Sequence, residues 1–471
     1  MVPSNFVRAV RESGYLSIST AIAELLDNAL QASASEIVIT ITRTDANSLP
    51  EITVEDDGVG MSKKELETCL RFGGSSRFDA RHSFGRFGMG LPAASLSQAK
   101  RVEVTSWQGH GDELSVALDV DLVSNGTPPA LAATKVGRSR SESGTRVRWM
   151  QCDRIEYRRL AWLERALHRD LGRMYRHFIS NGSRISINGK PVEPIDPLLL
   201  SAKVQGASAS LAFDPLCYEL ETSGGDTSMV NVRFSMLPVH RWHHLDNVTK
   251  RRIGIVGHGG VSILRAGREI ANGWHLMGGK RKENYDDWWR CEITFEPPLD
   301  EHFGITINKQ GIRPSAELRE ALEPELESIA RLLNSRVRQA FEDVKFQSGA
   351  EASCHIAAAA DRDLPVLPKR HGRRAIGPLN YRISTTQLAP DELFATTLQS
   401  NVLDVQLNVD HPAFNALYKP LQTLADGGAE FRTALELLIL SFARSAMTTP
   451  DSTDRLLAEW GTTYGRMLQK A

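Results

Sequence analysis

The sequence predicts an α+β protein with a mixed N-terminal unit, a strand-rich middle region and a small helical or α/β C-terminal tail. Strand and helix patterns alternate over the first 150 residues, strand patterns dominate to about residue 311, and a long helical stripe follows. A length of 471 residues favours about three domains. With 41% hydrophobic and 24% charged residues, the chain is typical of globular proteins with a sizeable core.

The first unit alternates helix and strand. Its predicted elements are a helix over residues 5–34 broken near Gly14, strands at 36–41 and 51–54, a helix at 62–72, a Gly-, Ser- and Arg-rich stretch at 73–90, and strands at 101–107, 113–120 and 144–149. Ser62 and Glu65 have the spacing of a capping box, which marks the start of the second helix. We predict that this domain covers residues 1–153.

The rest of the chain divides into three parts. Residues 154–345 are predicted as a second domain with a helix at 154–179, a hairpin at Ile185–Gly189, strands at 229–236, 260–265 and 289–295, and a long helix at 315–345 that Pro324 could kink. Residues 346–400 are predicted as a linker because they hold alanines, prolines and a basic cluster at 369–374. Residues 401–471 are predicted as the tail.

Composition sets limits on partners and compartment. The net charge is -1, from 56 basic and 57 acidic residues, so a polyanionic partner is neither required nor excluded. The five cysteines form no Cys-x-x-Cys pair, which favours a reducing cytoplasm. We expect no signal peptide and no membrane partner, because the apolar run at 437–440 is far shorter than the ~20 residues of a span.

A polar pair stands on the first helix. Glu24 and Asn28 are four residues apart and share the face opposite Ile18 and Ile22. A carboxylate there can take a proton from an attacking water. An amide oxygen is a hard ligand that suits a magnesium ion keeping most of its waters. An amphipathic helix with a solvated polar face explains the same pattern.

A carboxylate and two glycines follow the second strand, in Glu55–Met61. Gly58 and Gly60 allow the backbone to approach a ligand closely. A carboxylate at the strand end could accept a hydrogen bond from an exocyclic amine such as that of adenine. A tight turn is the alternative, because Asp-Gly is a common turn dipeptide.

A glycine-rich run, Phe84–Leu91, opens a helix with the spacing Gly-x-x-Gly-x-Gly. Free backbone N–H groups at the positive end of a helix form an anion site. The spacing differs from the Gly-x-Gly-x-x-Gly of a Rossmann motif. Upstream, Gly74–Arg77 adds hydroxyls and a cation suited to phosphate oxygens. Residues 73–85 could close over a ligand as a lid, or form an ordinary surface loop.

A fourth motif, Ser143–Val147, places Gly-Thr at a strand start, and the order of all four resembles one superfamily. Helix, strand-turn, glycine lid and strand start follow one another within about 130 residues. The series resembles the GHKL superfamily, named for gyrase, heat-shock chaperones of the ninety-kilodalton class, histidine kinases and MutL. The resemblance covers roughly residues 5–150 and implies a Bergerat-type α/β sandwich that binds ATP with Mg²⁺ and hydrolyses ATP.

The resemblance implies a role for each motif. Glu24 would be the general base, Asn28 would hold Mg²⁺, Asp56 and not Asp57 would contact adenine, and Thr145 would assist near the base. The residues expected at the nucleotide are Asn28, Asp56, Gly58, Gly60, Met61, Ser75, Ser76, Arg77, Gly85, Arg86, Phe87, Gly88, Met89, Gly90 and Thr145.

Beyond residue 150 the resemblance implies a strand-rich transducer domain whose lysine reaches the terminal phosphate. Lys309, in Phe303–Gly311, is similar to that lysine; an ordinary surface lysine is the alternative. The lid is most similar to that of the MORC group and its bacterial relatives, although Arg77 stands where many relatives have lysine. This implies an ATP-dependent homodimer that acts as a clamp, with DNA as a candidate partner and bacterial defence as a candidate setting.

Other classes remain in view. A protein-folding chaperone would need a larger client-binding region than the tail after residue 400 offers. A sensor histidine kinase would need an upstream phospho-accepting histidine, and none stands before the helix of Glu24. A nucleotide-binding scaffold without turnover stays open. The histidines at 240–244 lack a metal-ligand pattern, and the basic groups at 250–252, 280–282 and 369–374 could contact nucleic-acid phosphates or simply be solvated.

Overall fold

A computed structural model describes most of the chain, in two compact units. The described residues are 11–12, 15, 17–45, 48–71, 90–124, 131–138, 142–157, 159–222, 224–305, 311–364, 378–418, 420–421 and 428–447. The first unit comprises residues 1–334 and the second comprises residues 335–471. Each unit is described separately below.

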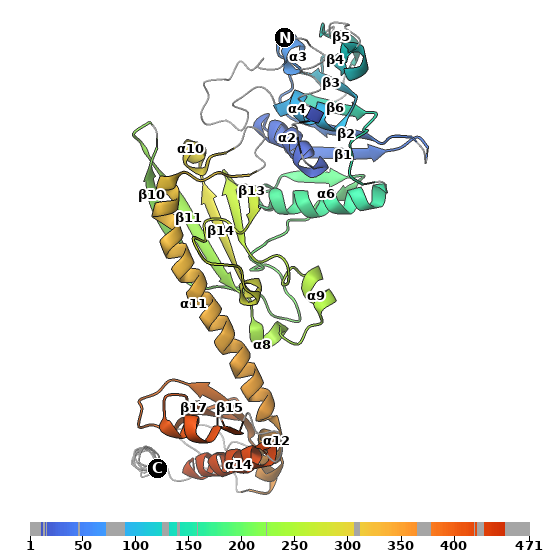
Figure 1. The fold of residues 1–471 in the computed structure, drawn as a ribbon. Helices are drawn as coiled ribbons and strands as arrows, with labels where there is room; N and C mark the ends of the chain where they lie inside the picture. Colours follow the sequence, from blue (N-terminus) through green and yellow to red (C-terminus); the bar gives the residue numbers. More distant parts are fainter. Residues whose placement is uncertain are drawn as a thin grey trace. The chain divides into compact units, whose positions relative to one another are not determined.

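An eight-stranded mixed sheet forms the N-terminal part of the first unit (Figure 1). Its strands are β1 (Glu36–Thr42), β2 (Glu51–Asp56), β3 (Arg101–Trp107), β4 (Asp112–Asp119), β5 (Thr134–Arg138), β6 (Gly144–Met150), β7 (Arg184–Ile187) and β8 (Lys190–Pro191). The order is β5-β4-β3-β6-β2-β1-β7-β8, and only β1 and β7 pair in parallel. Positive φ angles at Asn188 and Gly189 suit the tight turn of the predicted hairpin, which is present.

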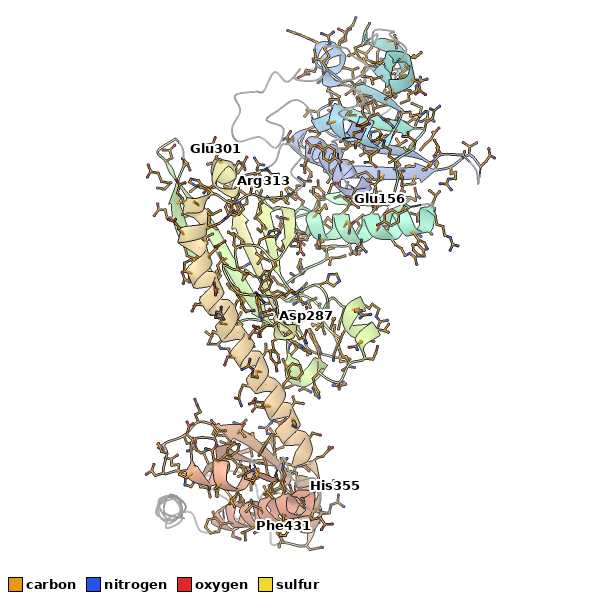
Figure 2. All side chains as sticks on the ribbon, in the orientation of Figure 1. Glu156, Asp287, Glu301, Arg313, His355 and Phe431 are labelled. Atoms are coloured by element: carbon orange, nitrogen blue, oxygen red, sulfur yellow. The ribbon has the colours of Figure 1, made fainter. Side chains whose placement is uncertain are left out.

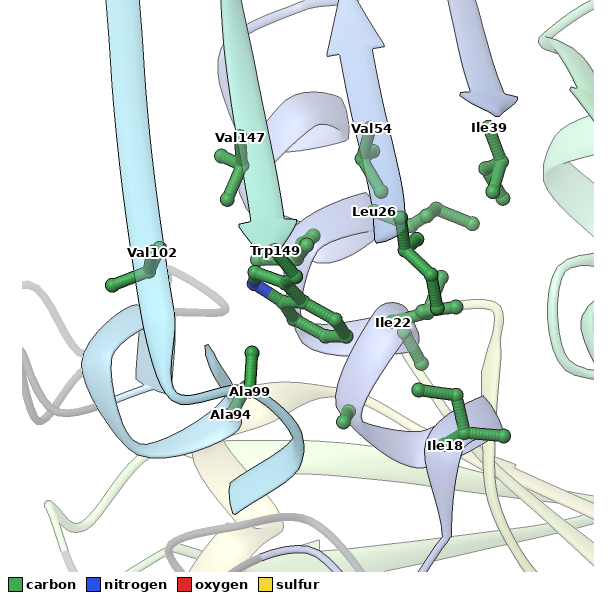
Figure 3. Packing of buried hydrophobic residues seen from close by; sticks show 14 of the residues in the cluster. Ile18, Ile22, Leu26, Ile39, Val54, Ala94, Ala99, Val102, Val147 and Trp149 are labelled. Atoms are coloured by element: carbon green, nitrogen blue, oxygen red, sulfur yellow. The ribbon is translucent and has the colours of Figure 1, made fainter. Parts of the chain in front are cut away.

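Helices cover one face of this sheet. They include α2 (Ile18–Gln31), α3 (Lys63–Cys69), α4 (Gly90–Gln98), α5 (Val120–Ser124), α6 (Leu160–Met174) and α7 (Arg176–Ser180). Ile18, Ile22 and Leu26 of α2 pack beneath strand residues such as Val54 and Trp149 (Figure 3). The capping box of Ser62 and Glu65 is present at α3. Because α6, β7 and β8 share this core and sheet, the sheet extends beyond the domain boundary predicted at residue 153.

A second sheet occupies the rest of the first unit. Its strands are β9 (Ser210–Leu211), β10 (Leu216–Glu221), β11 (Thr227–Met236), β12 (Val261–Arg265), β13 (Arg268–Gly273) and β14 (Trp289–Phe295), in the order β10-β11-β14-β12-β13 with β9 beside β11. Shorter helices are α8 (Val239–Trp242), α9 (Asn247–Arg252), η1 (Asn284–Trp288), η2 (Pro297–Leu299) and α10 (Asp300–Phe303). The predicted long helix is α11 (Ala316–Gly349), which contains Pro324. Its leucine stripe, from Leu318 to Leu333, is buried as the 3.6-residue period requires.

The second unit contains a three-stranded sheet flanked by helices. Its elements are α12 (Glu351–Ala360), η3 (Asp361–Asp363), β15 (Asn380–Thr386), β16 (Phe394–Gln399), β17 (Val402–Asn408), the π-helix η4 (Phe414–Tyr418) and α14 (Gly428–Ala446). The range 346–400, predicted as a linker, therefore includes α12, β15 and β16. Asp361 accepts hydrogen bonds from Leu379 N and Arg444 Nε at 2.7 Å each, and such long-range contacts leave no local sequence pattern. Phe431 lies exposed on α14 (Figure 2).

The α+β class predicted from the sequence is confirmed. A large mixed sheet with helices on one face is joined in sequence to a strand-rich region. In the described ranges, no helix combines the length and apolar character needed to cross a bilayer. All five cysteines are free thiols.

Candidate functional site

The polar pair of α2 lies inside the first unit. Ser17 caps the helix, its hydroxyl accepting from Thr20 N at 3.2 Å. Glu24 is only 4% exposed, so the alternative of a solvated helix face is wrong for this residue. The reason is tertiary, because α2 packs against residues of the sheet and also contacts α4 and α6. Asn28, one turn later, is half-buried.

The start of α4 lies directly against Glu24. A methyl group on Gly90 would approach Glu24 Oε1 to 2.1 Å and Glu24 Cδ to 2.8 Å, closer than any real Cβ contact. Any larger residue at this position would therefore displace the Glu24 carboxylate. The last glycine of the glycine-rich run and the carboxylate of the first motif thus share one location, although 66 residues separate them in sequence.

Asp56 ends β2 in a half-buried position. Its Oδ1 accepts a hydrogen bond from Gly58 N at 2.9 Å. Burial raises the pKa of Asp56 to about 6, against the opposing effect of the Gly58 hydrogen bond. Backbone N–H groups of Gly58 and Thr145 donate to this carboxylate, and a carboxylate has further acceptor sites that an amine-bearing ligand could use.

The two glycines after Asp56 pack against neighbouring backbone. A Cβ on Gly58 would lie 2.8 Å from Ala32 Cβ, and one on Gly60 would lie 2.2 Å from Trp107 O. Gly60 also has φ of +69°, which favours glycine. Val59 N donates to Ala32 O at 3.0 Å, so this turn is attached to the end of α2. The first two motifs are therefore adjacent.

A buried serine links the second and fourth motifs. Ser106 Oγ lies 2.8 Å from Met61 N, which donates to it, and 3.0 Å from Thr145 Oγ1. It also donates to Gly144 O at 2.9 Å. Thr145 is paired with Asp56 across β2 and β6. Ser106 was not among the residues predicted from the sequence. The pattern that could have indicated it is a hydroxyl at the third position of the buried alternation Val102, Val104, Ser106.

Asp57 and Tyr15 are two further residues close to these motifs. Asp57 accepts from Ser35 N at 2.7 Å and from Glu36 N at 2.8 Å, and it is exposed. Burial acts to raise its pKa, but these hydrogen bonds lower it overall. Asp57 therefore stabilises the turn between α2 and β1. Tyr15, which was missed, is buried and hydrogen-bonded to Glu24, and burial together with the Glu24 charge raises its pKa.

Nine predicted site residues lie outside the described residues. They are Ser75, Ser76, Arg77, Gly85, Arg86, Phe87, Gly88, Met89 and Lys309. The residues flanking the segment of Lys309 are joined by a hydrogen bond from Arg313 N to Phe303 O at 3.0 Å (Figure 2 labels Arg313). Gly304 takes φ of +58° there, and a Cβ on it would clash with Arg313 O.

The described residues could bind a magnesium nucleotide that needs only one or two ligands from the protein. No group of three or more His, Cys, Asp or Glu that could hold a metal occurs in the described part of the chain. Mg²⁺ commonly takes one or two protein oxygens and fills its octahedron with water and phosphate oxygens. The Asn28 amide, one helical turn from Glu24, is the residue that would supply such an oxygen. Gly90 begins α4, and free backbone N–H groups at the start of a helix suit an anion.

One family profile matches the N-terminal region of the chain. Residues 16–142 match the profile described as "Histidine kinase-, DNA gyrase B-, and HSP90-like ATPase". This range contains α2, the Asp56 turn and Gly90, and it ends just before β6. The match supports the GHKL superfamily for this region, and with it ATP binding at the level of the family.

Curated relatives are similar over a short stretch. The DNA mismatch repair protein MutL of Rickettsia africae (strain ESF-5) is 32% identical over 100 residues, which is 20% of this chain and 16% of the relative. MutL of Rickettsia canadensis (strain McKiel) is 33% identical over 93 residues, covering 19% and 14%. MutL of Rickettsia akari (strain Hartford) is 31% identical over 106 residues, covering 21% and 17%. The chain thus spans about a sixth of these relatives' length.

Proposed function

We propose that this protein is a magnesium-dependent ATPase in which nucleotide binding and hydrolysis drive a conformational clamp. The proposal depends above all on one observation, the contact between Gly90 and the buried Glu24 carboxylate. It brings a candidate general base to the helix end where phosphate would bind. Asp56 supplies an acceptor for the adenine amine, and the family match supports ATP as the ligand.

Each residue has a defined task in the proposed reaction, ATP plus water giving ADP and phosphate. Glu24 accepts a proton from the attacking water, and Asn28 contributes an oxygen to Mg²⁺. When bound, the ion neutralises charge on the phosphate oxygens. The backbone at Gly90 approaches the phosphates, while Asp56, with Ser106 and Thr145 behind it, orients the base. Lys309 is proposed to stabilise charge on the transferred phosphoryl group.

Glu24→Gln tests the assignment of the base. The substitution keeps the shape of the side chain, so we expect ATP binding to persist while turnover falls about 10²–10⁴-fold. Titration calorimetry with Mg·ATP and single-turnover hydrolysis measure the two quantities. Wild-type turnover in the variant would remove Glu24 from the role of base. Tight binding with no turnover in the wild-type protein would favour the scaffold alternative.

The proposed clamp is an ATP-dependent homodimer of the MORC-like kind, in the cytoplasm and in a bacterial defence setting. It follows from the similarity of the lid sequence to the MORC group. Glu24→Gln offers a direct test, because blocked hydrolysis should trap the closed state. Sedimentation of this variant with ATP should give a dimer, and without nucleotide a monomer. A chaperone function is the rival, and it would be favoured by suppression of client aggregation that depends on ATP.

DNA is the partner that we propose for the clamp. Basic side chains gather around α9 and η1, where Arg251, Arg252, Arg281 and Lys282 are exposed and Lys250 donates to His243 O. Such a group suits phosphate contacts, whose affinity falls steeply with salt. Replacing Arg251 and Arg252 together by Ala should weaken duplex binding at low salt and flatten its salt dependence. Equal DNA binding by the wild-type protein and this variant would contradict a DNA-binding surface around α9 and η1.

A further inference from the structure

A buried ion pair joins the helix of the candidate base to the second sheet. Arg268 Nη1, at the start of β13, lies 3.0 Å from Asp27 Oδ2 on α2, and both side chains are at most 4% exposed. The Tyr175 hydroxyl lies 2.7 Å from Asp27 Oδ1 and 2.6 Å from Ala23 O. Ala23 directly precedes Glu24, and Asp27 lies three residues after it on the same helix. The contact therefore acts on the segment of α2 that carries the candidate base.

Both partners of Asp27 hold definite protonation states. Burial acts to lower the pKa of Arg268, but the negative charges of Asp27 and Glu24 raise it overall, so the guanidinium stays charged. Burial raises the pKa of Tyr175 well above its ordinary value, which keeps its hydroxyl a donor. The Arg268 guanidinium also lies 5.9 Å from the centre of the Tyr175 ring. Asp27 is thus held by a cation on one oxygen and a neutral donor on the other.

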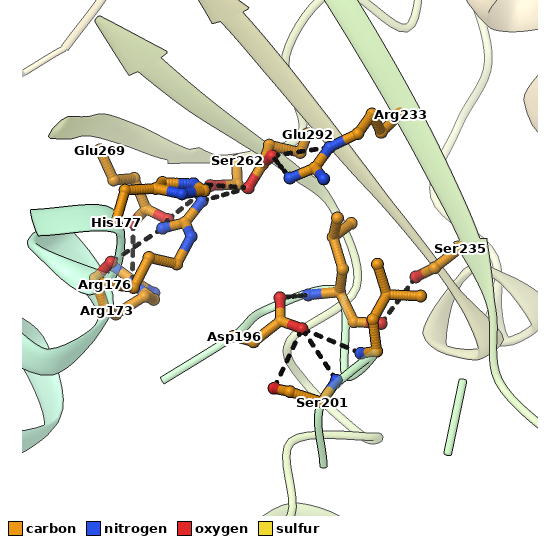
Figure 4. Close-up of polar contacts among 12 residues, drawn as sticks. Arg173, Arg176, His177, Asp196, Ser201, Arg233, Ser235, Ser262, Glu269 and Glu292 are labelled. Carbon is orange, nitrogen blue, oxygen red and sulfur yellow. Dashed lines mark hydrogen bonds and ion pairs between the residues drawn. The ribbon is translucent and has the colours of Figure 1, made fainter. Parts of the chain in front are cut away.

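The next residue along each element forms a second connection. Arg176 follows Tyr175, Glu269 follows Arg268, and these two are paired at 3.0 Å. Arg176 also pairs with Glu292 of the central strand β14 at 2.6 Å, and Figure 4 shows Arg176 between the two glutamates. The junction of α6 and α7 is therefore attached to the second sheet at two successive residues. Through Asp27 the same junction is attached to α2.

A buried ion pair is a poor source of stability, since the cost of desolvating two charges offsets most of their attraction. Such a pair can instead fix the relative position of two elements, because removing either partner leaves an uncompensated buried charge. We propose that Arg268 is a positioning residue for hydrolysis: its ion pair with Asp27, supported by Tyr175, sets the register of α2 against β13 and so the place of the Glu24 carboxylate. This inference depends on the proposed ATPase function. Under this inference the rate of ATP hydrolysis also depends on contacts between α2 and the second sheet.

The test compares Asp27→Asn, Arg268→Met and the double variant with wild-type protein. The readouts are kcat, the Kd of a non-hydrolysable ATP analogue with Mg²⁺, and the melting temperature. Asp286→Asn is the matched control. It makes the same substitution in an equally buried ion pair, Lys280 Nζ to Asp286 Oδ1 at 2.7 Å, which does not contact α2. Tyr175→Phe, which removes only a hydroxyl, serves if the charge variants fail to fold.

We expect each single variant to lower kcat by about 10²-fold, the effect of a misplacement near 1 Å, with the analogue Kd unchanged. The double variant should lose no more than the worse single variant, because both remove one interaction. Asp286→Asn should lower the melting temperature while keeping kcat. Unchanged kcat in Arg268→Met or Tyr175→Phe, or an equal loss in the control, would overturn the inference. Wild-type protein that neither binds nor hydrolyses ATP would instead refute the proposed function.

Discussion

Replacing Asp56 by Asn should stabilise the ligand-free protein at neutral pH while weakening nucleotide binding. In the folded protein burial raises the pKa of Asp56 from 3.8 to about 6. Because the folded-state pKa is the higher one, the carboxyl contributes most to stability below pH 3.8. That contribution is lost as pH rises through about 6. At pH 7 the ionised, half-buried carboxylate therefore carries a cost that a neutral amide at the same position would not.

The size of this effect follows from the shift itself. At about 1.4 kcal/mol for each pKa unit, the shift from 3.8 to about 6 corresponds to an order of magnitude of about 3 kcal/mol. Asn retains an oxygen that can accept from Gly58 N, so that hydrogen bond does not reverse the sign. The affinity for ATP, in contrast, should fall. A hydrogen bond from the adenine amine to a neutral amide is weaker by about 1 kcal/mol or more than one to a carboxylate, which is roughly tenfold in Kd.

Melting curves between pH 4 and pH 8, with titration calorimetry for ATP, measure both effects. Asp57→Asn is the matched control at the adjacent position. Its hydrogen bonds to Ser35 and Glu36 give it a lowered pKa, so its contribution to stability is present above pH 3.8 and lost as pH falls through the lowered value. Asp57→Asn should therefore lower the melting temperature at pH 7 and leave the ATP Kd unchanged. Equal pH dependence in Asp56→Asn and wild-type protein would refute the reasoning.

Two further substitutions probe the packing of the site. Gly90→Ala should reduce kcat about 10²-fold, because the added Cβ would lie 2.1 Å from Glu24 Oε1 and must displace Glu24 to reach about 3.4 Å. Gly137→Ala is its control, because a Cβ there meets nothing closer than 3.5 Å. Equal kcat in the two variants would argue against the contact between Gly90 and Glu24. Ser106→Ala should cost about 1–3 kcal/mol of stability and weaken ATP binding, since Met61 N loses its buried acceptor. Denaturant unfolding and calorimetry measure these losses, and unchanged affinity would separate Ser106 from the nucleotide.

The local pattern of the sequence determined the elements and the order of the motifs. Period-two alternation predicted most strands of the first sheet, and the capping box of Ser62 and Glu65 indicated the start of α3. The positions of Asp56, Gly58 and Gly60 after β2 followed from the same local pattern. These features depend on residues within one or two turns of each other, so a single segment contains the information.

Only the tertiary structure decided which residues meet. The burial of Glu24 and its contact with Gly90 depend on helices that cover α2, and helical periodicity by itself assigned Glu24 to a polar face. The pairing of Asp27 with Arg268 joins positions 241 residues apart, and β15 and β16 gain their order from partners such as Asp404 and Leu407 on β17. Burial and long-range pairing arise from the whole fold, and a buried charge is tolerated only where the fold supplies its partner.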